Sequence, residues 1–378
     1  MRNRLQFSVV LTAVLGFGLQ SQAGDLPAPG TVTLGSSGVS VNGLVDTYIN
    51  YNFNEPAHSN NTAASPQNRF RYNDRASRQF DIYEATVGLH KDADPVGFDF
   101  KIGQGTRYKV MNSGEASTGF EYVRDANVSW ESGKFSMLLG RFDSGFGMEN
   151  GTSVNNWNYS RGTSFTLLTP EFYTGVKFGY NFGSGVTFGI GVVNGANRFA
   201  DNNVGKTVPI WLMWENDDTS VAFNGVMGSE QDASSRALRR TLGFTAKHQY
   251  SKMFGVGLDG TWRNEKDAVV APATSTLPAS KKKADAYGAG LYVNTSFWDN
   301  VQDNFRADWM RDNDGAVTGT ARNLTSFTLT HRCMHSKNLN FWAELRYDTS
   351  EINSFMNDKG LTVEKNQFTG TLAATLQI

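Results

Sequence analysis

The chain has 378 residues, a formal net charge of −1 and one cysteine, Cys333. The near balance of charge argues against a nucleic-acid partner, and a single cysteine cannot form an internal disulfide. Aromatic residues make up 12% of the chain and there are 39 glycines, yet beyond the first 23 residues no apolar run approaches the roughly 20 residues of a membrane helix. These features exclude the helical membrane class.

The N-terminal residues have the three parts of a secretory signal peptide. Arg2 and Arg4 precede a mostly apolar stretch, and a small-x-small cleavage site ends at Ala23. An N-terminal membrane anchor is the alternative, but it would need roughly 20 apolar residues. We therefore expect an exported protein in which residues 1–23 are removed and residues 24–37 form a short periplasmic segment.

The first predicted strand covers residues 41–53 and has two different faces. Val45, Ile49 and similar residues occupy one face, whereas the other carries a mostly polar row that includes Asp46. Alternation with period two is typical of a strand that meets lipid on one side and water on the other.

Long and short connections alternate along the rest of the chain. Turn-forming residues predict short connections at 91–95, 131–134, 183–185, 215–219, 250–253, 297–303 and 334–338. Long connections are predicted near 54–79, 107–120, 143–171, 194–206, 229–238, 264–285, 312–322 and 349–365. Eight long and seven short connections join about sixteen strands, and one missed or invented hairpin would make the count 14 or 18. The predicted fold is all-β, a closed antiparallel transmembrane β-barrel with short periplasmic turns and long extracellular loops, in a single domain over residues 38–378.

The third long connection, 143–171, mixes aromatic residues, glycines and both charge signs without strand periodicity. If it lay outside the barrel, Trp157 and Tyr159 would be exposed to water. We therefore expect this third extracellular loop to fold into the lumen and to narrow the channel, with an ordinary external loop as the alternative. The candidate constriction residues are Arg141, Asp143, Glu149, Arg161, Glu171 and Lys177, with the acidic Asp143 and Glu149 facing Arg161, Arg141 or Lys177.

A polar row that recurs on the predicted strands would form the wall of a water-filled lumen. The lumen-lining candidates are Asn42, Asp46, Asn50, Lys101, Asp125, Asn127, Asp259, Glu344, Arg346 and Asp348.

Three motifs suggest chemistry but lack the context that the chemistry requires. Residues 255–260 match the dinucleotide fingerprint inside a period-two strand with no following helix. His331, Cys333 and His335 share a strand face that continues an apolar row, which favours a lipid-facing surface over a metal site. Residues 312–315 lack the remaining ligands of a calcium loop. We therefore predict no catalytic residue, no metal and no cofactor.

The chain ends in a strand from Phe368 to Ile378, apolar on one face and rich in threonine on the other. It also carries an ordered set of motifs, namely residues 41–54, Gly140-Arg141-Phe142 with 145–149, Asn158-Tyr159-Ser160-Arg161, and Val193-Asn194-Gly195 with Lys206-Thr207. This set resembles the putative beta-barrel porin-2 (OmpL-like) family of Gram-negative outer membranes. The resemblance covers essentially the whole mature chain and implies an outer-membrane channel-forming protein. Many barrels end in phenylalanine, whereas this chain ends in an isoleucine at the same phase.

The expected function is passive diffusion of small hydrophilic solutes or ions through a porin. One alternative is a structural or adhesin barrel with a closed lumen and partner-binding loops. A lipase-like membrane enzyme is another, but His90 and His248 have no evident partners for a catalytic triad. The expected partners are outer-membrane lipid, lipopolysaccharide near the basic run 281–283, and the barrel-assembly machinery through the last strand. The solute and the oligomeric state stay open.

Overall fold

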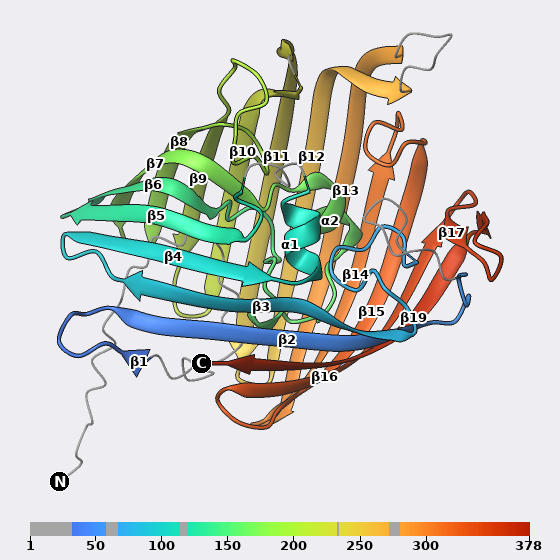
Figure 1. The fold of residues 1–378 in the computed structure, drawn as a ribbon, viewed down its shortest axis with the longest axis horizontal. Helices are drawn as coiled ribbons and strands as arrows, with labels where there is room; N and C mark the ends of the chain where they lie inside the picture. The colour runs from blue at the N-terminus through green and yellow to red at the C-terminus, as the bar shows by residue number, and fades with distance from the viewer. Residues whose placement is uncertain (1–31, 58–66, 114–118, 233, 272–279) are drawn as a thin grey trace.

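The computed structural model describes residues 32–57, 67–113, 119–232, 234–271 and 280–378 (Figure 1). The predicted signal peptide and most of the expected periplasmic segment lie outside the described residues. None of the described helices is both long and apolar enough to cross a membrane.

Sixteen antiparallel strands of the described chain form one closed barrel (Figure 1). They are β2 (Ser40–Asn52), β3 (Gln79–Lys91), β4 (Val96–Gln104), β5 (Val123–Ser132), β6 (Phe135–Asp143), β7 (Phe172–Gly183), β8 (Val186–Val193), β9 (Val208–Glu215), β10 (Thr219–Gln231), β11 (Ser234–Ser251), β12 (Phe254–Ala271), β13 (Ser280–Trp298), β14 (Val301–Asp312), β15 (Arg322–Met334), β16 (Leu339–Ser350) and β19 (Asn366–Gln377). The predicted fold class and strand number are confirmed, and all seven short turns lie where they were predicted.

The remaining described elements are short and lie outside the barrel strands. They are β1 (Val32–Thr33), α1 (Thr106–Met111), η1 (Ser153–Asn155), α2 (Thr163–Leu168), β17 (Phe355–Met356) and β18 (Thr362–Glu364). The strand β1 pairs with β2, and β17 pairs with β18 in the last long connection.

The barrel closes where β19 pairs with β2. In this seam Leu372 lies opposite Ile49 and Thr371 lies opposite Asn50. At the periplasmic end of this seam, the backbone N–H and C=O groups of Gly43 and Ile378 exchange two hydrogen bonds of 2.9 Å. Closure leaves no free strand edge inside the membrane, where unpaired backbone groups would be very costly.

The two faces of the strands differ as the alternation predicts. On β19 the side chain of Leu372 is 61% exposed, whereas its neighbour Thr371 is 4% exposed. On β2, Val45 and Tyr51 are exposed, and Asp46 lies on the buried inner row. The apolar residues therefore point to the lipid and the polar rows point inward.

Two of the long connections are shorter than predicted, because strands continue through them. The link between β10 and β11 contains only residues 232–233, whereas a connection at 229–238 was predicted. The strands β12 and β13 likewise extend through most of 264–285, so that β11, β12 and β13 have 18, 18 and 19 residues. On the extracellular side of the lipid, both faces of a strand meet water. Strand pairing therefore continues there without the alternation of apolar and polar residues that marks a membrane strand.

Candidate functional site

The inner face of the barrel is a polar wall that is largely shielded from solvent. All ten residues predicted to line the lumen lie on strands, and their side chains belong to the polar rows. Asn42 and Lys101 are half-buried. The other eight are buried: Asp46, Asn50, Asp125, Asn127, Asp259, Glu344, Arg346 and Asp348.

The segment between β6 and β7, residues 144–171 and here called the inserted segment, accounts for much of this shielding. Its first residues contact β9, β10, β11, β12 and β14, and it carries η1 and α2, of which α2 is labelled in Figure 1. The indole Nε1 of Trp211 donates to the carbonyl of Ser144 at 2.8 Å, and the amide of Asn224 donates to that of Gly145 at 3.1 Å. The first residues of the segment are therefore bonded to β9 and β10.

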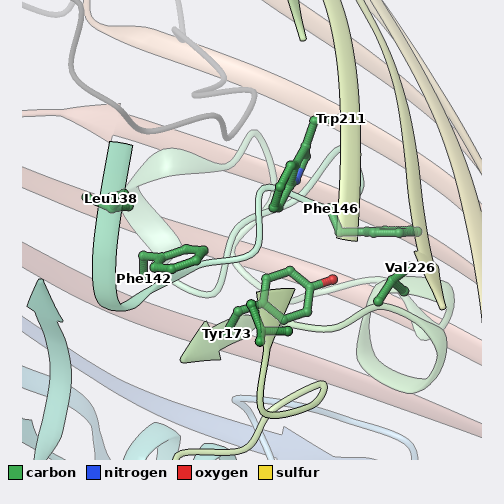
Figure 2. Packing of buried hydrophobic residues seen from close by; sticks show 7 residues of the cluster. Leu138, Phe142, Phe146, Tyr173, Trp211 and Val226 are labelled. Atoms are coloured by element: carbon green, nitrogen blue, oxygen red, sulfur yellow. The ribbon is translucent and has the colours of Figure 1, made fainter. Parts of the chain in front are cut away.

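An apolar cluster holds the start of the inserted segment against the wall. Figure 2 shows the cluster between strands and segment, with Leu138, Phe142, Phe146, Tyr173, Trp211 and Val226 labelled; its seventh member is Val193. Phe146 comes from the segment and is 2% exposed, whereas the others come from β6, β7, β8, β9 and β10. Burying a large aromatic side chain of this kind contributes roughly 1.5–3 kcal/mol.

Glycines on the inner row let the inserted segment approach the wall closely. A Cβ atom at Gly243 would lie 2.5 Å from the ring of Phe146, and one at Gly257 would lie 2.5 Å from Cε of Met148. At Gly288 it would meet the hydroxyl of Ser164 in α2. Contacts under 3 Å are repulsive, so side chains at these positions would push the segment away from β11, β12 and β13.

Glu149 and Asp308 tie the segment to β14 through charged hydrogen bonds. The guanidinium of Arg306 lies 2.7 Å from Glu149 and 3.0 Å from Asp308. The two carboxylates also accept backbone N–H groups of the segment, Glu149 from Gly162 at 2.7 Å and Asp308 from Thr163 at 2.7 Å. Burial raises the pKa of Glu149, and the nearby Arg306 opposes that shift.

Glu344 on β16 and Asp46 on β2 hold the middle of the inserted segment. The carboxylate of Glu344 accepts the backbone N–H groups of Tyr159 at 2.8 Å and of Ser160 at 3.1 Å. The phenol of Tyr159 donates to Asp46 at 2.9 Å, and its carbonyl accepts from Asn73 at 3.1 Å. The segment therefore contacts strands on opposite sides of the barrel seam.

The three predicted constriction cations make hydrogen bonds or ring contacts within the barrel. Arg161 donates to the carbonyls of Asn150, Tyr159 and Gly151, so it stabilises the segment internally. Arg141 donates to Asn112 at 2.6 Å and stacks on the ring of Phe172. Lys177 lies 4.5 Å from the centre of the Trp211 ring. The expectation that these three cations face Asp143 or Glu149 across a constriction stays a prediction.

A charged cluster near the ends of β3 to β6 contains the remaining predicted residues. Arg124 pairs with Asp143 at 3.0 Å and also with Asp125, which lies 3.7 Å from Lys101. A second group joins Arg107 to Glu84 at 2.8 Å and to Glu171 of the inserted segment. The side chain of Asp143 is 34% exposed and that of Lys101 is 25% exposed, so charges of both signs remain in contact with solvent.

A cavity of about 130 Å³ lies beside this cluster on the β3 to β6 side of the lumen. Its lining runs from the periplasmic turn after β3 to the start of the inserted segment, and comprises His90, Lys91, Asp92, Ala93, Asp99, Arg124, Asp125, Asn127, Ser129, Glu131, Leu138, Phe142 and Asp143. The lining is predominantly polar and charged, as a wall in contact with water requires.

The sequence did not identify Arg107, Arg124 or Glu84 as members of this cluster. Arg107 lies in α1, inside a stretch predicted to be a loop. Arg124 sits at an irregularity between β4 and β5, where the register shifts by one residue. Such a shift turns a side chain to the other face, so simple alternation cannot identify its direction.

Several solved structures have the same fold at low sequence identity. The outer membrane channel DcaP of Acinetobacter baumannii matches with a TM-score of 0.59 and 8% identity, over 93% of this chain and 100% of that one. An anion-selective porin from Comamonas acidovorans gives 0.58 and 11%, over 90% and 99%. Salmonella typhi OmpF, solved in complex with daunomycin, gives 0.56 and 12%, over 92% and 100%. No curated protein matches the sequence.

The model of one protein family, described as putative beta-barrel porin-2, OmpL-like, matches residues 38–378. The match covers every barrel strand, and it agrees with the resemblance seen in the motifs. Together with the closed barrel it supports an outer-membrane location and a porin-like role. The chain belongs to the putative beta-barrel porin-2, OmpL-like family.

Proposed function

We propose that the protein is a porin that lets small hydrophilic solutes or ions diffuse passively across the outer membrane through a narrow path. The observation that carries the proposal is the polar cavity between β3 and β6, which is lined by Asp125 and the partly exposed Asp143, with the partly exposed Lys101 3.7 Å from Asp125. A solute on this path passes the cavity and then the charged cluster. The inserted segment limits its size from the opposite side.

Opposed charges at the narrowest point give such a path both a size limit and an electrostatic filter. Arg124 and Lys101 provide positive charge, whereas Asp125 and Asp143 provide negative charge within 4 Å of them. In a narrow, partly desolvated passage these charges act on a permeating ion more strongly than in bulk water. Because the cluster contains both signs, neutralising one member shifts the ion preference.

Recording single-channel currents in a planar lipid bilayer tests the proposal. Purified, folded protein is expected to give discrete conductance steps, and a variant lacking residues 152–158 is expected to give larger ones. Retention of the barrel is checked by a gel shift between unheated and boiled samples, since a closed barrel resists detergent until heated. Silent membranes for both folded proteins would contradict a porin.

A barrel with a closed lumen is the second candidate function, and one observation favours it. The inserted segment contacts β9, β10, β14, β16 and β2, and the inner rows of these strands are almost fully shielded from solvent. Such a barrel would act through its extracellular loops, as a structural protein or an adhesin. The bilayer experiment separates the two, because a closed barrel conducts only after the segment is shortened.

A further inference from the structure

The strands β12, β13 and β14 carry an aromatic row, continued on β11 by Leu242, that marks the extracellular edge of the lipid-facing surface. Leu242, Trp262 and Tyr287 lie opposite one another on adjacent strands, and Trp309 on β14 lies two residues below Arg311, the partner of Tyr287. Tyr287 is 39% exposed and Trp309 38% exposed. Tryptophan and tyrosine concentrate at membrane interfaces, so the lipid headgroups begin at this level.

Four cations occupy the same outward face at and above this row. They are Arg240, Lys281, Lys283 and Arg311, here called the cationic collar, and all four are exposed. Lys281 and Lys283 are an even number of residues from Tyr287 and therefore lie on the same face of β13. Arg240 lies two residues from Leu242 on β11, on the extracellular side. The strands β11 to β14 span about 14 Å at the usual spacing of roughly 4.8 Å, and the rise of roughly 3.3 Å per residue places Lys283 and Lys281 about 13 and 20 Å along β13 from Tyr287.

The collar has no acidic partners among the described residues. Lys282, which has the opposite parity, pairs with Asp314 at 2.8 Å, whereas no collar residue takes part in an ion pair. The carboxylate of Asp285 on this face accepts from Trp262 at 3.2 Å and Asn264 at 2.9 Å. Four positive charges at and above headgroup level therefore face one carboxylate, that of Asp285, on the outward row of β13.

The outward face of the neighbouring strands β15, β16 and β19 lacks such a concentration of charge. At the upper ends of β15, β16 and β19 the outward positions are Asn323, Thr349 and Asn366. Near them lies an acidic residue, Glu351, which accepts from Asn323. The cationic collar therefore does not continue onto β15, β16 and β19, which favours a specific partner over general attraction to the membrane.

We propose that the cationic collar binds the phosphate groups of a phosphorylated glycolipid in the outer leaflet, with its acyl chains lying against Leu242, Tyr287 and Trp309. Arginine and lysine side chains complement phosphate, and arginine can donate two parallel hydrogen bonds to it. An aromatic and aliphatic surface directly below the charges suits the acyl chains. The proposal rests on the outer face of the barrel and does not depend on solute passage through the lumen.

Binding of lipopolysaccharide to the full-length, delipidated protein in detergent tests the proposal. The collar variant carries Arg240→Gln, Lys283→Gln and Arg311→Gln. The control variant removes three exposed cations from periplasmic turns, through Lys134→Gln, Lys252→Gln and Lys337→Gln. Each charge near a membrane surface contributes about 1 kcal/mol, so the affinity of the collar variant is expected to fall about 100-fold, and that of the control to stay unchanged.

Two further arms identify the chemistry that is recognised. In the first, the wild type is expected to bind enzymatically dephosphorylated lipopolysaccharide weakly, with the affinity that the collar variant has for intact lipopolysaccharide. In the second, inorganic phosphate alone is expected to bind weakly to all three proteins. Single-channel conductance of the collar variant is expected to equal that of the wild type, which separates this proposal from the porin function. Equal affinity of the collar and control variants, or undiminished binding of the dephosphorylated lipid, would overturn the proposal.

Discussion

The guanidinium of Arg306 on β14 donates to the carboxylate of Glu149 in the inserted segment at 2.7 Å, and both side chains are buried. Their contact joins the wall of the barrel to the segment that fills it. Arg306 also donates to the carbonyl of Ser160 at 2.5 Å, so one side chain holds two distant points of the segment. The position of the segment therefore depends on a few charged wall residues.

Replacing Glu149 by Gln is expected to loosen the inserted segment while the barrel remains folded. The change removes the negative charge beside Arg306, although Asp308 still compensates that cation. We expect a loss of about 1–3 kcal/mol in the free energy of unfolding and larger, noisier single-channel currents. Glu215→Gln at the exposed end of β9 is the control, and equal currents from both variants would place the restraint elsewhere.

A side chain at Gly257 is expected to displace the inserted segment, whereas the same change at Gly260 is expected to have little effect. Both glycines lie on β12, but Gly257 faces Met148 and Gly260 has no atom closer than 4.0 Å to its added Cβ. Gly257→Val should cost about 1–3 kcal/mol through overpacking and should alter conductance. Urea unfolding and bilayer recordings of the two variants check this, and matching results would exclude the close contact.

Neighbouring residues on β5 are expected to differ sharply in their tolerance of charge. Val128 is 50% exposed on the lipid side, whereas Ser129 lines the cavity. Val128→Lys should cost about 2–4 kcal/mol near the bilayer midplane, and Ser129→Lys should fold and shift the ion preference toward anions. Folding yield in lipid vesicles measures the first effect, and reversal potential measures the second. Similar yields would mean that the strand has the opposite orientation.

Neutralising Asp143 is expected to shift selectivity toward anions, because Arg124 would then lose one of its acidic partners beside the cavity. Arg124→Gln should shift selectivity toward cations. The shifts should be larger at 0.1 M than at 1 M KCl, because salt screens the charges. Reversal potentials in a salt gradient measure them, with Asp358→Asn in an exposed loop as the control. Two shifts of the same sign would be inconsistent with a filter at this cluster.

Most of the fold could be predicted because lipid imposes alternation on each strand. Leu372 and Thr371 illustrate this, since one must contact acyl chains and the other must not. The strands above the membrane were missed because this constraint ends there, as at Lys281 and Lys283. The candidate site was harder, since the partner of Glu149 lies 157 residues away on β14. The pairing of inner-row cations with acids depends on how far neighbouring strands are shifted relative to one another. The alternation of residues along one strand does not determine that shift.

The seam between β19 and β2 has a consequence for how the protein is made. Its pairs join residues that lie more than 300 positions apart, such as Asn50 and Thr371, whose side chains share a hydrogen bond of 2.7 Å. Contacts of such long range form late and slowly during folding. Until β19 has been synthesised and delivered, β2 is an open edge able to pair with a wrong strand. The nascent chain must therefore be kept apart from other unfolded chains during its passage to the outer membrane.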